Sequence, residues 1–407
     1  MTAYRAAWIC PIDQAPIRDG LVIVEAGRIV SVGSRESFDS AQDRPGVRSR
    51  DLGNVVLMPG LINAHIHLEL SWLRGRVPPA SRFTEWVRAM FAVRGRPNAA
   101  LSAEQVASIR QAIIELQAAG TVAVGDTSNS LAAIGPMREA QLDGVVFHEL
   151  LGFKEGDGAL VESTRGSRAS AAAAGARVSV APHAPYSTSP ELFQAIRAEV
   201  DASACPIMSV HLGESPEETE LLTTGTGPWR GMLESIGVWR DDWAVPGCGP
   251  VEYLDRLGVI DAHTLVVHGV QFEDAALARL AGIGATLVTC PRSNQWVGVG
   301  LPPIQRFYDS GVPVAIGTDS LASVDDLNLF SELKTMRAIA PAVRASRLLE
   351  SATLTGARAL GLDADLGSLT PGKRAKIIAI ELPGTLDDIE EHLVSGIAPA
   401  LISHLNA

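Results

Sequence analysis

This chain of 407 residues has few cysteines and no runs of basic residues. Each of these features argues against particular classes of protein. Its four cysteines lie far apart and form no CxxC pair, which argues against a disulfide framework or a thiolate zinc cluster and favours buried, reduced thiols. No stretch of Lys and Arg suited to tracking phosphates occurs, and 34 basic residues against 46 acidic ones give a formal net charge of −12. We therefore expect no nucleic-acid polymer among its partners.

Long apolar runs are also missing. No window of 18 apolar residues is free of charged residues or of Gly and Pro, so we expect no membrane partner. The beginning, MTAYRAAWICPIDQ, lacks the basic start, apolar stretch and cleavage site of a signal peptide. Because 46% of the residues are apolar and 20% are charged, the chain can bury a large core. These features predict a folded cytoplasmic enzyme with a small-molecule substrate, and they leave a homo-oligomer open.

The two ends of the chain are rich in short segments typical of β-strands. LVIVEAGRIVSVG, residues 21–33, predicts a hairpin that turns at Ala26 and Gly27. Near the other end, GSLTPGKRAKIIAIEL predicts a Pro-Gly turn followed by a strand. The two ends could form one small β module, although periodicity does not show pairing across 300 residues.

Between the two ends, short apolar runs alternate with amphipathic segments. Eight runs are predicted as buried parallel strands: LINAHIH, TVAVGDT, VVFHELLG, RVSVAPH, IMSVHLG, TLVVHGV, ATLVTCP and PVAIGTD. Helical segments intervene, for example SAEQVASIRQAIIELQAAG, residues 102–120. Eight such βα units predict an α/β protein with a closed (β/α)8 barrel. A doubly wound sheet is the alternative.

Four histidines and one aspartate lie within or at the carboxyl ends of predicted strands, where barrel enzymes build their active sites. His65 and His67 are spaced i, i+2, which on a strand directs both imidazoles to one face. His211, His268 and Asp319 end three other strands. Three imidazoles and one carboxylate suit one divalent ion, zinc or iron(II), with a position left for water. Hydrogen-bonded structural histidines are the alternative.

The order and spacing of these motifs resemble the amidohydrolase superfamily, specifically its mononuclear deaminase branch. The matching motifs span the chain: VLMPGLINAHIHLELS, APHAPYSTS, SVHLGESPEE, LVVHGV, CPRSN, GTDSLAS and GSLTPGKRAKIIAI. That family folds as a distorted (β/α)8 TIM barrel with a small β-sandwich built from both termini. The resemblance therefore implies a barrel at residues 59–361 and sandwich parts at residues 1–58 and 362–407.

The resemblance also assigns roles. It implies one zinc ion, or alternatively iron(II), held by four ligands: His65, His67, His211 and Asp319. His268 would orient the attacking hydroxide, and Glu214 would carry a proton to a ring nitrogen of the substrate. Asp319 would also take the proton of the water and deliver it to departing ammonia. No lysine ends the fourth predicted strand, RVSVAPH, where binuclear relatives carry a carboxylated lysine, and this argues for a single metal ion.

The implied reaction is hydrolytic deamination of an aminated heterocycle. Within the branch, HIHLELSWLRGRVP, FTEWV, CPRSN and GTDSLAS are most similar to the 6-aminodeoxyfutalosine deaminases of menaquinone synthesis. This chain departs from them at Ile66, where relatives more usually have Thr, and at Lys376, where they generally have Asp. Deaminases of S-adenosylhomocysteine, methylthioadenosine or guanine share most of the motifs, as do chlorohydrolases with another leaving group. A non-catalytic scaffold is disfavoured because the ligand set is complete.

Six further residues are predicted to contact the substrate: Glu69, Trp86, His183, Tyr186, Arg292 and Ser320. Trp86 is expected to stack on a purine, with helix packing as the alternative. Glu69 is expected to reach the substrate from the barrel mouth, or else to form an ion pair within its loop. Arg292 matches, by charge, the carboxylate of 6-aminodeoxyfutalosine.

Overall fold

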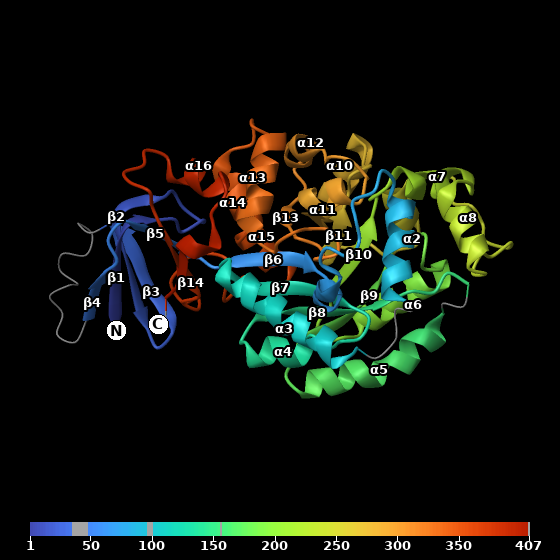
Figure 1. Cartoon of the computed structure of the whole chain (residues 1–407), viewed down its shortest axis with the longest axis horizontal. Coiled ribbons are helices and arrows are strands. Elements are labelled where there is room, and N and C mark those ends of the chain that lie inside the picture. The colour runs from blue at the N-terminus through green and yellow to red at the C-terminus, as the bar shows by residue number, and fades with distance from the viewer. Residues whose placement is uncertain (35–47, 96–100, 155–156, 406–407) are drawn as a thin grey trace.

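The computed structural model describes residues 1–34, 48–95, 101–154 and 157–405, which form a β-rich part and a larger α/β part (Figure 1). Both ends of the chain lie in the β-rich part (Figure 1). The first strand of the α/β part, β6, begins beside the β-rich part and points away from it toward helix α2 (Figure 1). The carboxyl ends of the central strands are therefore remote from the chain termini.

The β-rich part is one mixed sheet of seven strands. They are β1 (Thr2–Ile9), β2 (Ile17–Glu25), β3 (Arg28–Ser34), β4 (Arg48–Asp51), β5 (Val55–Pro59), β14 (Ile377–Glu381) and β15 (Ile402–His404). The predicted hairpin is confirmed, because β2 pairs antiparallel with β3 and its turn residues Ala26 and Gly27 have φ of 48° and 74°. β14 pairs antiparallel with β5, so residues more than 300 positions apart share one sheet.

The α/β part contains two four-stranded sheets in which all neighbouring strands are parallel. The first holds β6 (Leu61–Ile66), β7 (Thr121–Ser128), β8 (Asp143–Leu150) and β9 (Val178–Pro182). The second holds β10 (Met208–Leu212), β11 (Thr264–His268), β12 (Thr286–Thr289) and β13 (Val314–Ile316). The eight predicted apolar runs thus all form strands, and the prediction of an α/β fold with parallel strands is confirmed.

Helices connect the parallel strands along most of the α/β part. The connecting helices are η2 (Leu68–Leu73), α2 (Phe83–Arg94), α3 (Ala103–Ala118), α4 (Ile134–Glu139), α5 (Gly158–Ala173), α6 (Pro190–Asp201), α7 (Pro216–Thr224), α8 (Pro228–Ser235), α9 (Pro250–Arg256), α10 (Asp274–Ile283), α11 (Pro291–Trp296) and α12 (Ile304–Asp309). After β13 come α13 (Leu329–Ile339), α14 (Ala345–Ser351) and α15 (Leu354–Ala359). Between β14 and β15 lie α16 (Ile389–Val394) and η3 (Pro399–Leu401).

The predicted helix near residues 102–120 is α3, and its boundaries follow from local chemistry. Ser102 and Gln105 form a reciprocal capping box at its start. Gly120, with φ of 85°, follows its end. Ile109, Ile113 and Leu116 are buried among its residues, which is the apolar face expected from their spacing.

Backbone hydrogen bonds connect the two parallel sheets at both pairs of edges. The amide of His211 on β10 donates to the carbonyl of His183 after β9 (2.9 Å), and the amide of Asp319 after β13 donates to the carbonyl of His65 on β6 (3.1 Å). Side chains from both sheets also share one buried core cluster, which includes Ala64 on β6 and Val267 on β11. The carboxyl ends of strands from both sheets therefore face a common space.

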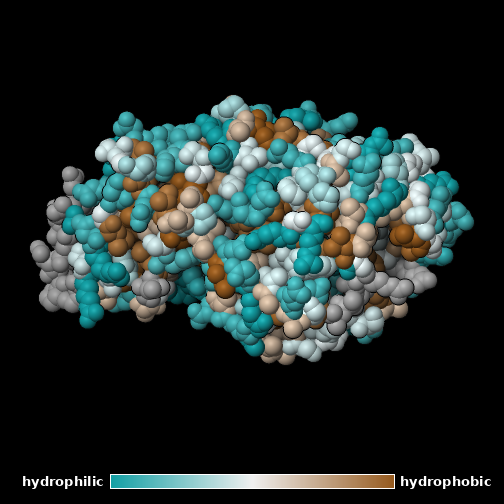
Figure 2. All heavy atoms as spheres, in the orientation of Figure 1, coloured by the Kyte–Doolittle hydropathy of each residue, from teal (hydrophilic) through white to brown (hydrophobic). Residues whose placement is uncertain are grey.

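The surface of the molecule is mixed in character. On the face shown in Figure 2, hydrophobic residues are scattered among hydrophilic ones. Among the described residues, no helix combines the length and the apolar composition needed to cross a membrane.

Candidate metal centre and substrate cavity

The predicted ligands converge at the carboxyl ends of the strands. The side-chain nitrogens of His65, His67 and His211 that could bind a metal ion all lie within 4.8 Å of one another. Nε2 of His67 lies 3.3 Å from Nε2 of His211, and Oδ1 of Asp319 lies 3.7 Å from Nε2 of His67 and 3.9 Å from Nε2 of His65. The spacing of the histidine pair on β6 and the ends of β10 and β13 thus bring four candidate ligands together.

These histidines are held in the neutral form that can bind a metal. Burial, and then the neighbouring imidazoles, lower the pKa of His65 and His67 well below 6.5. Burial likewise lowers the pKa of His211 to about 4. Nδ1 of His211 lies 3.1 Å from the carbonyl oxygen of His183, to which it donates, so the lone pair of that ring is on Nε2.

The structure also contains an atom that a metal ion would satisfy. Nε2 of His65 is buried and has no hydrogen-bond partner among the described residues. A buried imidazole nitrogen of this kind is rarely left without a partner. Three neutral imidazoles and a carboxylate are ligands that zinc and iron(II) both accept, so the residues fit a single divalent ion.

The backbone conformation of Asp319 is unusual for an aspartate at the end of a strand, and a hydrogen bond orients its carboxylate. Asp319 has φ of 61°, an unusual conformation for a residue other than glycine, and His268 shares it with φ of 80°. Ser293 donates to Oδ2 of Asp319 (2.6 Å), which leaves Oδ1 directed at the histidines. Burial raises the pKa of Asp319 to about 6, so the carboxylate is largely ionised at neutral pH.

Glu214 is a second buried carboxyl group of the site. Its side chain is only 4% exposed, and its Oε1 lies 3.5 Å from Nε2 of His268. Burial, followed by the charges of Asp319 and Glu218, raises the pKa of Glu214 well above 4.5. Asn294 donates from Nδ2 to Nδ1 of His268 (3.1 Å), which places the ring proton on the nitrogen that faces Glu214. Glu214 therefore holds its proton more tightly than an exposed glutamate does, which suits a proton donor.

The loop that carries Glu214 is fixed by its own sequence. The carboxylate of Glu218 accepts hydrogen bonds from the amides of Gly213 (3.0 Å) and Glu214 (3.1 Å). Gly213 has φ of 63°, and a Cβ atom there would lie 2.2 Å from the ring of Phe272. The HLGE segment therefore needs glycine between His211 and Glu214.

A cavity of about 70 Å³ lies against this cluster. Its lining residues are His67, Leu70, Phe83, Trp86, Met90, Arg94, Glu149, His183, Tyr186, His211, Glu214, His268, Val297, Asp319 and Ser320. Four of the six predicted substrate contacts are among them. The volume of this cavity is below the roughly 300–1,000 Å³ that small-molecule sites typically enclose.

Aromatic side chains form one wall of the cavity. Trp86 stacks against Phe83, with ring centroids 6.2 Å apart and planes within 7°. Tyr186 stacks on Trp229 at 3.8 Å, and Nδ1 of His183 is 2.6 Å from the hydroxyl of Ser187. The buried Nε1 of Trp86 has no acceptor among the described residues, so a ligand could supply one.

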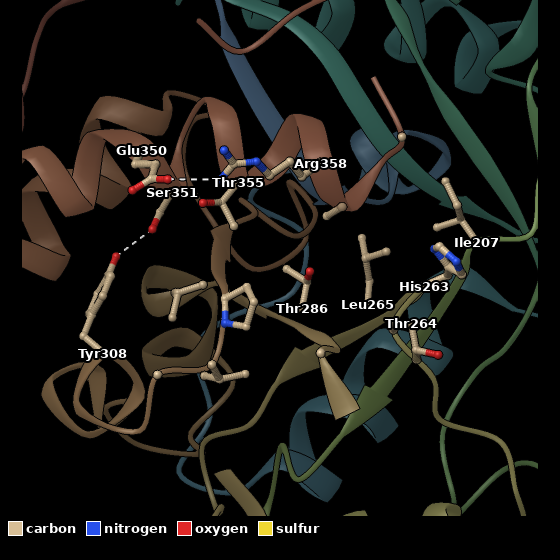
Figure 3. Close-up of a pocket in the computed structure, with 18 of the residues that line it drawn as sticks. Ile207, His263, Thr264, Leu265, Thr286, Tyr308, Glu350, Ser351, Thr355 and Arg358 are labelled. Atoms are coloured by element: carbon tan, nitrogen blue, oxygen red, sulfur yellow. Dashed lines mark hydrogen bonds and ion pairs between the residues drawn. The ribbon is translucent and has the colours of Figure 1, made fainter. Parts of the chain in front are cut away.

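A larger cavity of about 430 Å³ lies at the opposite ends of the strands (Figure 3). Thr264, Thr286 and Val314, the first residues of β11, β12 and β13, line it. Figure 3 shows an ion pair of Arg358 with Glu350 (3.2 Å) in its wall. None of the converging histidines and neither Glu214 nor Asp319 lines this cavity. Cavity size therefore does not mark the candidate chemical site in the described chain.

Two predicted substrate contacts are not brought to the cavity. Oε1 of Glu69 accepts from Arg94 (2.9 Å), so the alternative interpretation, an ion pair, describes Glu69. Arg292 donates to both oxygens of Asp326 (2.8 and 3.2 Å) and lies 3.6 Å from Glu332. The expectation that Arg292 meets a substrate carboxylate is not supported, because carboxylates of the chain already bind its guanidinium outside the cavity lining.

Two charged residues of the cavity, Glu149 and Arg94, were not predicted from the sequence. Glu149 faces inward from β8, with Oε1 3.5 Å from Nδ1 of His211. The strand alternation could have found it, since Val145 and Phe147 belong to the inner core cluster and Glu149 continues their face. Arg94 ends α2, and no spacing rule connects it to a site more than 25 residues away in the sequence.

Known proteins share this architecture. A model of the amidohydrolase family matches residues 56–402. A 5-methylthioadenosine/S-adenosylhomocysteine deaminase of Nitratidesulfovibrio vulgaris is 30% identical over 382 residues, which cover 90% of this chain and 80% of the relative. The structure of an adenosine deaminase from Xanthomonas campestris with bound zinc has 25% identity and a TM-score of 0.82, and the match covers 98% of this chain and 90% of that one.

A further solved structure, aminofutalosine deaminase of Helicobacter pylori in complex with methylthio-coformycin, is similar to the whole fold. It has a TM-score of 0.85 and 23% identity, and the match covers 100% of this chain and 98% of that one. At this identity the likeness shows the fold alone. Because the family model spans most of the sequence, this chain belongs to the amidohydrolase family.

Proposed function

We propose that this protein is a hydrolytic deaminase of a 6-aminopurine nucleoside, and that 6-aminodeoxyfutalosine is its substrate. The observation that carries the proposal is that two buried carboxyl groups, Glu214 beside His268 and Asp319 beside His67, line one cavity. Burial and neighbouring charge raise the pKa of Glu214 well above 4.5, whereas Asp319 has a pKa of about 6, and two carboxyl groups in different environments can divide the roles of acid and base between them. The deaminase relative and the family membership support a hydrolase that acts on C–N bonds.

We propose that His65, His67, His211 and Asp319 hold one divalent ion, zinc or alternatively iron(II). When bound, such an ion lowers the pKa of a water molecule toward neutrality. The buried, unpaired Nε2 of His65 and the neutral imidazoles support this assignment. Zinc in the Xanthomonas relative is consistent with it.

The residues of the chain would then move the protons of the reaction. Water adds to the ring carbon that carries the amino group, a C–O bond forms, and the C–N bond to ammonia breaks. Glu214 protonates the adjacent ring nitrogen, because charge develops there when the ring loses its aromaticity. Asp319 accepts one proton of the attacking water and delivers it to the leaving ammonia, while His268 orients the nucleophile. The second proton of the water returns to Glu214 when the carbonyl group of the product forms, which restores the acid.

We further propose that the eight parallel strands close into one barrel over residues 59–361, and that residues 1–58 and 362–407 form one small β domain. The predicted sandwich would require the seven strands, which make a single mixed sheet, to fold over a common core. The hydrogen bonds between the two sheets at His211 and Asp319 support closure, and so does their shared core cluster. In a closed barrel the active site is built at the carboxyl ends of the strands, which is where the candidate ligands lie.

Ammonia release tests the proposal directly. The zinc-loaded protein would be assayed with 6-aminodeoxyfutalosine, S-adenosylhomocysteine, methylthioadenosine, adenosine and guanine. We expect the highest kcat/KM for 6-aminodeoxyfutalosine, which would place the enzyme in menaquinone synthesis. The relative from Nitratidesulfovibrio favours the second candidate, a deaminase of S-adenosylhomocysteine or methylthioadenosine. Release of chloride from a chlorinated heterocycle without any ammonia release would contradict a deaminase.

A further inference from the structure

Arg94, at the end of α2, lines the cavity and has hydrogen-bond donors without a partner among the described residues. Its Nη2 donates to Oε1 of Glu69 (2.9 Å) and to Oδ1 of Asn129 (2.7 Å). Its Nε and Nη1 groups have no hydrogen-bond partner within the part of the chain that the structure describes. Since a guanidinium carries five N–H donors, three of them remain for a ligand.

Glu69 holds the guanidinium of Arg94 in place, but the charge of Glu69 is shared with other hydrogen-bond donors. Glu69 is 3% exposed, and its other oxygen, Oε2, accepts from the hydroxyls of Ser128 (2.9 Å) and Ser130 (2.7 Å) and from the amides of Asn129 and Ser130. These donors also stabilise the negative charge of Glu69, so Arg94 is not its sole partner. The result is a fixed cation in the cavity wall with donors left over, an arrangement that favours tight recognition of an anion.

Arg94 is also the only lysine or arginine that lines this cavity in the described residues. The rival predicted from sequence, Arg292, is occupied by Asp326 and Glu332. Two turns before Arg94 on the same helical face, Trp86 has a buried Nε1 with no acceptor. The wall formed by α2 thus supplies unpaired donors, whereas Glu149, Glu214 and Asp319 supply carboxyl groups on the other sides.

We infer that Arg94 binds a carboxylate on the substrate and thereby selects 6-aminopurine nucleosides with an acidic substituent over neutral ones. This inference rests on the proposed function and adds to it the residue that recognises the acidic end. An arginine fits the planar carboxylate better than a lysine does, because its donors match the two oxygens. When a neutral nucleoside fills the cavity, the Nε and Nη1 groups of Arg94 would have no partner.

The test compares Arg94→Met and Arg94→Lys with the matched control Arg292→Met, which removes an arginine near the site that carboxylates of the chain already bind. We would measure kcat/KM for 6-aminodeoxyfutalosine and S-adenosylhomocysteine, which carry carboxylates, and for methylthioadenosine, which does not. Calorimetry would give dissociation constants for adenosine-5′-carboxylate and 5′-deoxyadenosine. Thermal unfolding of each variant would show that it folds.

We expect the preference of the wild type for the acidic compound, expressed as a ratio, to fall by about 10- to 100-fold in Arg94→Met, the range expected for charge-assisted hydrogen bonds. Arg94→Lys should recover part of that ratio, and Arg292→Met should keep it. An equal affinity of the wild type for acidic and neutral nucleosides, or an unchanged ratio in Arg94→Met, would overturn the inference while leaving deamination intact. A binding preference that depends on Arg94, without any ammonia release, would instead uphold the inference and refute the proposed reaction.

Discussion

Replacing the Glu214 carboxyl group by an amide is the sharpest perturbation of the proposed mechanism. Gln has nearly the same shape, but it cannot pass a proton to a ring nitrogen. The side chain of Glu214 is only 4% exposed, so bulk water has little access to take over the transfer. General acid catalysis typically contributes about 10²–10⁴-fold, and we expect the loss of kcat in Glu214→Gln to lie in the upper half of that range. At ~1.36 kcal/mol for each factor of ten, this corresponds to about 4–5.5 kcal/mol of transition-state stabilisation.

The assay pairs ammonia release with the zinc content per chain. Glu214 is not among the proposed ligands, and its contact with the cluster is through His268 at 3.5 Å, so the variant should keep its metal ion. Glu217→Gln is the matched control, because Glu217 is a buried glutamate in the first turn of α7, three residues after Glu214, that does not line the cavity, and kcat should stay close to that of the wild type. If Glu214→Gln retained wild-type kcat, or lost zinc together with activity, the reasoning would be refuted.

Three further predictions follow from the structure. Glu149→Gln should weaken zinc affinity by no more than about 10-fold, the lower end of the range for groups around metal-bound histidines, because Glu149 lies 3.5 Å from Nδ1 of the proposed ligand His211 but the hydrogen bond of that nitrogen goes to the carbonyl of His183; competition with a chromophoric chelator would measure it. Removal of the metal by a chelator should abolish ammonia release, and added zinc should restore it; activity that survives metal removal would contradict the proposed centre. Glu199→Gln should destabilise the fold at pH 7 by about 1.5–3 kcal/mol, because Glu199 binds Arg165 (2.7 Å) and the buried Arg168 (2.9 Å), whereas Glu162→Gln, which removes an exposed partner of Arg165, should cost much less. Hydrogen bonds from Arg165 and Arg168 outweigh the effect of burial and lower the pKa of Glu199 to about 2. The stabilisation by Glu199 is therefore fully present above pH ~4.3 and is lost as the pH falls toward 2. Denaturant unfolding at several pH values should show the free energies of unfolding of the wild type and Glu199→Gln converge between pH ~4.3 and 2.

Local periodicity was enough to predict the elements that carry the candidate ligands. The i, i+2 spacing of His65 and His67 and the apolar runs before His211 and Asp319 are properties of neighbouring residues, and a strand requires no more than that. The capping box of α3 was readable for the same reason. The alternation of β8 likewise places Glu149 on the same face as Val145 and Phe147, so its position could have been predicted from the sequence.

The sequence by itself determined the parallel strands, the order of the motifs and the residue types that converge on the candidate metal centre, because strand patterning and side-chain chemistry are encoded within a few residues. Only the tertiary structure decided which arginine faces the cavity. Arg94 and Arg292 look alike in sequence, yet Asp326 and Glu332 occupy one, while Glu69 and Asn129 hold the other with donors to spare. That difference depends on partners that lie 25 to 40 positions away in the chain, and folding alone brings them into contact.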